Sequence, residues 1–307
     1  MNEKVTKEPA IPVVMRICDC LEERKILSQT EQNLLYNAEQ GYTGECEFYA
    51  FLQDAASNKL LLLSSLSLRA NNANFQIDSI LINNETIYLF EVKNYAGDYY
   101  ISKNRWFSHP ARKEISNPFI QLKRSEGLLR QLLATHGIDY PIKAYVVFVN
   151  PEFTLFNASI NYPLILRSQF SRFFRPSFFQ QTPYSDKDFY VAQFLMDSHQ
   201  DVIYKENLPS YTFAELKKGI KCPKCGRFMR VETFYRVKCS VCLYIERNES
   251  AVLRSINDFK FLFPEMKITT KNIVEWCNIL SARVIRRILS NYLERRGQGR
   301  STHYIFK

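Results

Sequence analysis

Residues 75–93 read FQIDSILINNETIYLFEVK, and this stretch predicts two β-strands joined by a tight turn. Residues 75–82 alternate in polarity, and residues 87–92 form a dense aromatic and β-branched run, which is typical of strands. Between them, Asn83-Asn84-Glu85 supplies the polar residues that hairpin turns favour. An earlier apolar run at residues 60–68 adds a strand, so three successive strands are expected.

The segments around these strands indicate a mixed α/β domain, because helical and strand patterns alternate along the chain. Residues 13–40 are expected to be helical, and a turn at residues 41–44 is expected to open a second helix that carries Glu45. The pattern further predicts an extra strand or hairpin at 99–107, a helix from Asn117-Pro118 to about 136, a buried strand at 142–149, irregular aromatic chain from 151 to 179 and a helix at 186–198.

Two carboxylates and a lysine are expected on one face of the central hairpin. Glu91 and Lys93 share a face because side chains alternate along a strand. If the turn consists of Asn84 and Glu85, Asp78 falls opposite Glu91. Such a group can hold Mg²⁺ or Mn²⁺ for phosphodiester hydrolysis, whereas the alternative is a solvent-facing ion pair of little energetic value.

Four short motifs together resemble the nuclease-related domain (NERD) family, a branch of the PD-(D/E)XK nuclease superfamily. They are Gly44-Glu45, the FQID of residues 75–78, the FEVKNY of residues 90–95 and Asn117-Pro118 followed by Gln121. The resemblance covers roughly residues 40–150. It implies a PD-(D/E)XK-like mixed sheet flanked by helices.

The same resemblance implies a role for each matching residue. Asp78 and Glu91 would be ligands of Mg²⁺ or Mn²⁺, and Lys93 would assist the attacking water. Glu45, preferred over Glu47 because it follows the glycine, would be a further acidic residue near the metal, and Gln121 a polar contact. Gln76 stands where many superfamily members have proline, a departure that this family shares.

Two C-x₂-C pairs, Cys222/Cys225 and Cys239/Cys242, are separated by thirteen residues and predict a zinc ribbon with a hairpin at 229–237. Four thiolates fill the coordination of Zn²⁺, so the metal would be structural, with iron as a minor alternative. The other cysteines, at 18, 20, 46 and 277, are interpreted as ordinary thiols. The four histidines do not cluster with other ligands and are interpreted as noncatalytic.

The positive charge of the chain lies behind residue 216. Residues 217–307 hold 20 Lys or Arg and 7 Asp or Glu, a net +13, whereas residues 1–216 have a net −3. Helices at 269–280 and 282–293, capped by threonine and serine, followed by a basic turn and a strand at 302–306, suggest a helix-turn-helix or winged helix, with a plain packing module as the alternative. The candidate nucleic-acid contacts are Lys224, Arg227, Arg283, Arg286, Arg287, Arg295, Arg296 and Arg300.

The expected segments are an N-terminal helical segment (1–40), a nuclease-related domain (41–205), a connector (201–216), a zinc ribbon (217–248) and a basic helix-turn-helix or winged-helix-like module (252–307). No signal peptide or membrane helix is expected, which favours the cytoplasm. The leading hypothesis is a metal-dependent DNA endonuclease. A noncatalytic DNA-binding or regulatory protein and an RNA-processing factor are the alternatives, and the oligomeric state stays open.

Overall fold

The computed structural model describes residues 5–56, 60–179, 184–200 and 208–307, and the chain forms two units. The first consists of Met1–Pro12 and Tyr36–Tyr204, and the second of Val13–Leu35 and Lys205–Lys307. The N-terminal residues are therefore shared between the units. Part of the expected connector, residues 201–207, lies outside the described residues.

A six-stranded mixed sheet forms the centre of the first unit, with the strand order β1-β2-β3-β4-β8-β10. Its strands are β1 (Thr6–Lys7), β2 (Leu61–Ala70), β3 (Ala73–Asn83), β4 (Thr86–Lys93), β8 (Ile142–Phe148) and β10 (Leu164–Leu166). The strands β2, β3 and β4 pair antiparallel, whereas β8 runs parallel to β4. The three predicted successive strands, the strand at 142–149 and the mixed α/β class are thus confirmed, although residues 143–145 of β8 are not buried.

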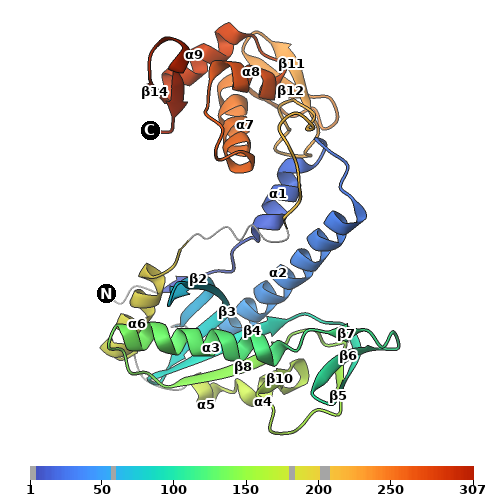
Figure 1. The fold of residues 1–307 in the computed structure, drawn as a ribbon, viewed down its shortest axis with the longest axis vertical. Coiled ribbons are helices and arrows are strands. Elements are labelled where there is room, and N and C mark those ends of the chain that lie inside the picture. The colour runs from blue at the N-terminus through green and yellow to red at the C-terminus, as the bar shows by residue number, and fades with distance from the viewer. Residues whose placement is uncertain (1–4, 57–59, 180–183, 201–207) are drawn as a thin grey trace. The chain divides into compact units, whose positions relative to one another are not determined.

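Helices cover both faces of this sheet (Figure 1). The long helices α3 (Pro118–Thr135) and α6 (Asp186–Asp197) contribute to the apolar cluster on one face. On the other face, α2 (Gln29–Ala55) and α4 (Phe170–Phe173) pack through Phe48, Leu52 and Phe170. Two further short helices are η1 (Arg167–Gln169) and α5 (Pro176–Phe179).

The helix α3 begins where the sequence predicts, because Asn117 caps it by accepting a hydrogen bond from the backbone N of Phe119. By contrast, the expected helix at 13–40 and turn at 41–44 are wrong. The chain breaks at 22–28, between α1 (Val13–Leu21) and α2, and α2 continues through both Gly41 and Gly44. These glycines do not end the helix, and the second has a packing role at the site.

A second, four-stranded sheet has the order β7-β6-β5-β9 and extends the first unit. Its strands are β5 (Gly97–Ser102), β6 (Arg105–His109), β7 (Glu114–Ile115) and β9 (Phe153–Phe156). The predicted hairpin at 99–107 is therefore confirmed. The segment expected to be irregular after residue 151 instead contains β9, β10 and short helices. Trp106, 1% exposed, stacks on Phe148 and anchors the second sheet to the core.

The second unit joins the cysteine-rich segment to a helical module. It contains β11 (Met229–Thr233), β12 (Arg236–Cys239), β13 (Ile245–Arg247), α7 (Asn248–Leu262), α8 (Thr270–Cys277), α9 (Ala282–Tyr292), β14 (Glu294–Arg296), η2 (Gly299–Ser301) and β15 (His303–Ile305). The predicted hairpin at 229–237 corresponds to β11 and β12. Thr269 and Ser281 cap α8 and α9 as expected, but α8 ends at Cys277 because Asn278 adopts a left-handed conformation.

The last 60 residues have the element order expected of a winged helix. A β-bridge joins Ile268, between α7 and α8, to Tyr304 on β15, and β14 pairs antiparallel with β15. The order is therefore helix, bridging strand, two helices and a hairpin. The inner face of α9 is apolar, since Val284, Ile285 and Ile288 are buried.

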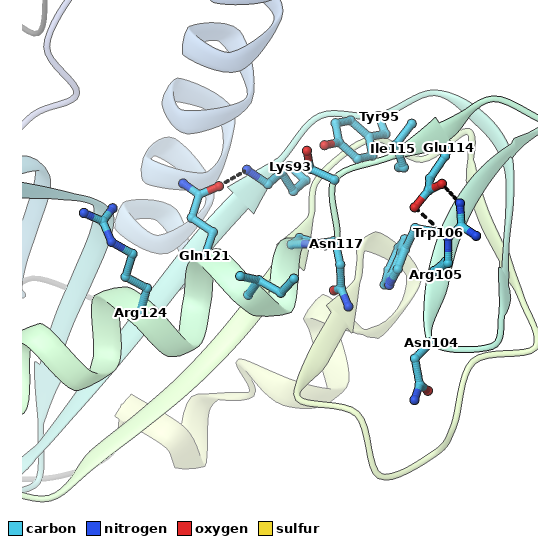
Figure 2. A pocket seen from close by; sticks show the side chains of 13 residues that line it. Lys93, Tyr95, Asn104, Arg105, Trp106, Glu114, Ile115, Asn117, Gln121 and Arg124 are labelled. Atoms are coloured by element: carbon cyan, nitrogen blue, oxygen red, sulfur yellow. Dashed lines mark hydrogen bonds and ion pairs between the residues drawn. The ribbon is translucent and has the colours of Figure 1, made fainter. Parts of the chain in front are cut away.

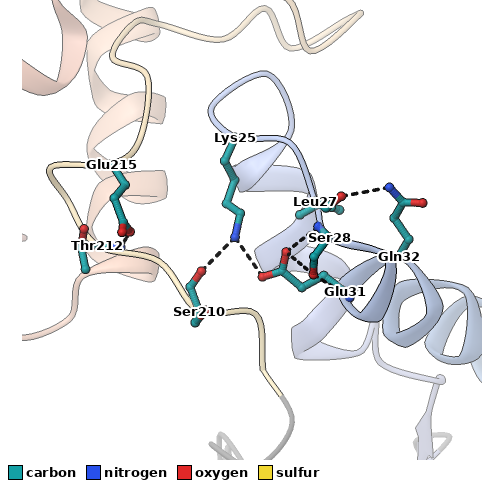
Figure 3. A network of polar contacts seen from close by, with 8 residues as sticks. All are labelled: Lys25, Leu27, Ser28, Glu31, Gln32, Ser210, Thr212 and Glu215. Atoms are coloured by element: carbon teal, nitrogen blue, oxygen red, sulfur yellow. Dashed lines mark hydrogen bonds and ion pairs between the residues drawn. The ribbon is translucent and has the colours of Figure 1, made fainter.

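Residues 13–35 form part of the core of this second unit. Ile17 and Leu21 of α1 belong to the same apolar cluster as α7. Arg24, 1% exposed, donates to the backbone oxygens of Lys217 (3.1 Å) and Gly219 (3.0 Å), and its guanidinium lies 3.8 Å from the centre of the Trp276 ring. Lys25 bridges Glu31 and the carbonyl of Ser210, each at 2.9 Å (Figure 3).

We expect Arg24→Ala to destabilise the second unit by about 2–4 kcal/mol, because the change leaves a void on Trp276 and removes the donors of two carbonyls. Thermal unfolding followed by circular dichroism measures the effect. The neighbouring Lys25→Ala is the control, since a partly exposed ion pair contributes at most about 1 kcal/mol. Equal stability of Arg24→Ala and wild type would refute this role of Arg24.

Candidate active site and metal centre

The five residues implicated by the sequence motifs lie together at one end of the central sheet. Asn83 pairs with Thr86 and Ser79 with Phe90, which confirms the two-residue turn and sets Asp78 level with Glu91. Instead of a ladder bond, the Asp78 carboxylate accepts from the backbone N of Val92 at 2.9 Å. The register of one hairpin therefore brings the two carboxylates together.

Lys93 connects Glu91 to the helix behind the sheet. Its ammonium nitrogen lies 2.5 Å from Glu91 Oε1 and 3.2 Å from Gln121 Oε1, and Figure 2 shows the contact with Gln121 on α3. Glu91 is buried, at 1% exposure, whereas Gln121 is exposed. The lysine is thus held between a buried anion and a solvent-facing amide, with its charge at the edge of the site.

Glu45 joins the cluster because α2 approaches the end of β4 closely. A Cβ at Gly44 would lie 2.7 Å from the Cβ of Asn94 and 3.2 Å from a methyl of Val149, so only glycine fits. The carboxylate of Glu45 accepts from the hydroxyl of Ser65 at 2.9 Å. A glycine inside a helix costs stability, and here it permits the contact that brings the third carboxylate to the site.

Full ionisation would give the cluster more negative than positive charge. Burial and the neighbouring Asp78 carboxylate raise the pKa of both Glu45 and Glu91 to about 8, and burial also raises the pKa of Asp78. Burial opposes the charged form of Lys93, but Glu91 and Asp78 outweigh it and raise the pKa of the lysine. One ammonium cannot neutralise three carboxylates, so the site is suited to an added cation.

The donor set fits a hard divalent cation. Asp78 and Glu91 offer carboxylate oxygens, and Mg²⁺ characteristically takes one or two carboxylates and keeps several waters. Glu45, Asp78 and Glu91 are not a closed cage: in the described part of the chain, the four cysteines are the only set of three or more His, Cys, Asp or Glu with ligand atoms all within 4.8 Å. The residues therefore fit an ion held by two carboxylates.

Residues 40–149 match the family model of the nuclease-related domain. The matched segment contains all five clustered residues, and the resemblance noted from the sequence motifs is confirmed. The nuclease-related domain indicates a nuclease-like fold, a divalent metal and nucleic acid as partner. No curated protein and no solved structure matches the chain.

A pocket of about 500 Å³ opens beside Lys93 in the nuclease-related domain (Figure 2). Lys93 and Gln121 line it together with Tyr95, Arg105 and Arg124. Its volume lies in the usual range for small-ligand sites, and its lining combines aromatic rings with cationic and amide groups. Such a lining suits a nucleotide.

Two residues near the cluster were not anticipated from the sequence. Ser65 adopts a positive φ of 48°, accepts from the backbone N of Ala10 and donates to Glu45. Asn94 donates to the backbone O of Gln40 and accepts from Asn150. Asn94 follows Lys93 directly in the motif, which was an available signal, whereas the unusual backbone of Ser65 gives no sequence signal.

The second unit contains a separate candidate metal site, made of four cysteines. The sulfurs of Cys222 and Cys242 lie 3.5 Å apart and those of Cys225 and Cys239 3.4 Å apart, and all four lie within 4.8 Å of one another. A tetrahedral Zn²⁺ with Zn–S bonds of about 2.3 Å would space its sulfurs by about 3.8 Å. The four cysteines can therefore hold zinc, with no position open for catalysis.

Backbone amides support two of these thiolates. The N–H groups of Lys224 and Val241 each lie 3.4 Å from the sulfur two residues earlier, Cys222 and Cys239 respectively. Hydrogen bonds to thiolate ligands fix their orientation and spread their charge. Cys18, Cys20 and Cys277 are buried and Cys46 is half-buried, as interpreted from the sequence.

The candidate nucleic-acid contacts fall into two groups within the second unit. Lys224 and Arg227 lie in the first cysteine turn, and Arg227 pairs with Glu23. The others lie on α9, β14 and η2, and are Arg283, Arg286, Arg287, Arg295, Arg296 and Arg300. Of these, Arg287 pairs with Glu249 and Arg296 with Glu294, and the side chain of Arg300 lies outside the described residues.

None of the helices in the described residues is long and apolar enough to cross a membrane.

We expect Gly44→Ala to destabilise the nuclease-related domain by about 1–3 kcal/mol, since the added methyl collides with Asn94. It should also weaken Mg²⁺ or Mn²⁺ binding, because the collision displaces α2 and so moves Glu45 away from Asp78 and Glu91. Gly41→Ala is the matched control in the same helix. No atom lies within 4 Å of the Cβ it adds, so it should stabilise by about 0.5–1 kcal/mol. Thermal unfolding with and without metal compares the two, and an equal response would refute the packing argument.

We expect Cys225→Ser to lose bound zinc and to unfold the ribbon, because a cysteine set of this kind contributes metal-binding free energy directly to folding. Mass spectrometry of the intact native protein measures zinc content. Cys46→Ser, at a half-buried thiol in the first unit, should retain one zinc per chain. Full zinc occupancy in Cys225→Ser would contradict the assignment.

Proposed function

We propose that the protein is a Mg²⁺- or Mn²⁺-dependent DNA endonuclease that hydrolyses phosphodiester bonds. The observation that carries the proposal is the cluster of Asp78, Glu91 and Lys93, reached by Glu45 and Gln121, inside the segment that matches a nuclease-related domain. The register of β3 and β4 and the close contact at Gly44 serve to gather these groups.

Each residue has a separate task in this proposal. When bound, the divalent cation would supply Lewis acidity and make water a better nucleophile near neutral pH. Asp78 and Glu91 would hold the cation, while Glu91 also fixes the ammonium of Lys93. Lys93 would orient the attacking water and stabilise charge on the phosphate. Gln121 accepts from Lys93 through its oxygen, which leaves its NH₂ group free to donate to a phosphate oxygen.

The pocket beside Lys93 supports a place for the nucleotide next to the scissile phosphate. Arg105 and Arg124 could contact its phosphate, and Tyr95 offers a ring for a base. Arg105 also pairs with Glu114, so its guanidinium is held in position. This pocket connects the charge cluster to a binding surface of nucleotide size.

We further propose that the ribbon (217–248) and the C-terminal module (252–307) bring the catalytic domain to DNA. The winged-helix-like element order and the exposed Arg283 and Arg286 on α9 support duplex DNA, because its major groove admits a helix whereas that of A-form RNA is too narrow. Cysteines that are not joined by disulfides support a reducing compartment, the cytoplasm in our proposal.

We expect the pure protein to cut plasmid DNA with Mg²⁺ or Mn²⁺, and we expect Lys93→Met and Glu91→Gln each to lower the rate by about 10²–10³-fold. Both substitutions keep the side-chain volume and remove a charge. Lys143→Met is the matched control: Lys143 lies on the same sheet, level with Tyr88 at the far end of β4, and its loss should not change the rate.

Circular dichroism checks that the variants are folded, and filter binding on DNA checks that they still bind. Metal-dependent cutting that disappears in both site variants and persists in Lys143→Met would establish the nuclease activity. DNA binding without cutting by wild type would instead identify a noncatalytic DNA-binding protein on a nuclease-like fold.

A further inference from the structure

The ribbon exposes large apolar side chains that its own fold does not use. Phe234 and Tyr235 lie at the turn between β11 and β12, which are labelled in Figure 1. Their side chains are 65% and 60% exposed. The same small segment also exposes Val231, Val241, Leu243 and Ile245. Single exposed apolar residues are ordinary on proteins, but a concentration of them on one small element indicates an interaction surface.

The turn that carries the two rings is firmly held. Asn248, 1% exposed at the start of α7, donates from its side-chain amide to the carbonyl of Phe234 and from its backbone to that of Tyr235, each at 3.0 Å. The ring centres of Phe234 and Tyr235 lie 4.9 Å apart, edge to face. A buried asparagine thus fixes the turn that exposes two aromatic rings to solvent, so ligand binding does not carry the entropic cost of ordering this turn.

The outer face of the ribbon sheet is positively charged. Met229, Val237 and Cys239 point inward and are buried, so the rows between them point outward. One outward row is Arg230, Lys238 and Ile245, and the next is Thr233, Arg236 and Arg247. Lys238 pairs with Glu232 at 3.3 Å, whereas Arg230, Arg236 and Arg247 form no ion pair with any other described residue.

We propose that this face binds single-stranded nucleic acid, with Phe234 and Tyr235 stacked on unpaired bases and Arg230, Arg236 and Arg247 on the phosphates. Bases in a duplex are covered by their neighbours, so rings at a hairpin tip stack on unpaired bases without the cost of separating a base step. A groove that combines aromatic rings with unbalanced cations is the common composition of single-strand sites, whereas the centres of protein interfaces are depleted in charge.

This inference deepens the proposed function by naming the form of nucleic acid that the ribbon recognises. None of its residues belongs to the carboxylate cluster or to the arginines of α9 and β14. The ribbon face would hold an unpaired strand while the C-terminal module contacts duplex. A junction between single and double strands is the substrate form that would use both.

The test is fluorescence anisotropy with a labelled oligodeoxythymidylate and a duplex of equal length, at matched salt. The full chain, with its zinc retained, is used in the Glu91→Gln background without added Mg²⁺ or Mn²⁺, so that cleavage cannot interfere. Phe234→Ala and Tyr235→Ala should each weaken single-strand binding about 5- to 100-fold, because each removes one stacked base. Binding of the duplex should change much less.

Replacement by leucine separates stacking from apolar docking. Phe234→Leu and Tyr235→Leu keep an apolar side chain but lose the ring, so they should bind single strands as weakly as the alanine variants. Arg236→Ala with Arg247→Ala should lower the affinity and its dependence on salt. Phe156→Ala, at a ring 52% exposed in the first unit, is the matched control and should bind as the parent does.

Unchanged single-strand affinity in the Phe234→Ala, Tyr235→Ala double variant with full zinc content would overturn the proposal. Full single-strand binding by the leucine variants would also overturn it and would indicate an apolar protein partner. An equal loss of duplex binding in the alanine variants would overturn it as well. If single-strand binding depends on the two rings but the wild-type protein does not cut DNA, this inference stands and the proposed nuclease activity is rejected. If the protein cuts DNA but single-strand binding does not depend on the rings, the nuclease activity stands and this inference is rejected.

Discussion

The first unit is organised around three carboxyl groups whose full ionisation its own lysine cannot neutralise. Transfer of a carboxylate from water to a protein interior is unfavourable, and grouping three of them adds repulsion. The fold nevertheless buries Glu91, at 1% exposure, in an ion pair with Lys93. Asp78 accepts a hydrogen bond from a backbone amide, and Glu45 on α2 accepts one from Ser65. An arrangement of this kind is unfavourable for an inert scaffold and favourable for one that recruits a cation. The contact of Gly44 with Asn94 and the register of β3 on β4 are the geometric means by which the charge is collected.

The second unit meets a different requirement, because its cysteine segment is too small to hold itself together by apolar packing. Four thiolates around one ion can replace the missing core. Its remaining stability comes from α7, α8 and α9 and from α1, which packs against α7. Arg24 completes the structure by filling the space over Trp276 with a guanidinium that satisfies two carbonyls. Charge is thus structural in this unit, whereas in the first it gathers carboxyl groups that suit a cation.

Much of the fold could be predicted from local patterns, and the failures have physical causes. The turn at Asn84-Glu85, the cap at Asn117 and the paired C-x₂-C turns are decided by a few neighbouring residues, so the sequence predicts them well. The five site residues lie together as the motifs implied, although their catalytic roles stay predictions. The continuation of α2 through two glycines could not be read locally: the reason for a glycine at position 44 is Asn94, fifty residues later. The strands β1 and β10, of two and three residues, are too short for a periodic signal. The role of Arg24 depends on partners nearly two hundred residues away.

The interleaved order of the two units has a consequence for synthesis. Residues 13–35 leave the ribosome before their partners, because the residues of α7 that pack against α1 lie more than two hundred residues later. The nuclease-related domain, which lies between them, can therefore fold while Ile17 and Leu21 still lack their apolar neighbours. During that interval α1 is an exposed apolar segment that a chaperone could bind. The second unit can be completed only when its C-terminal helices have emerged, so a nascent chain would fold its nuclease-related domain before its second unit.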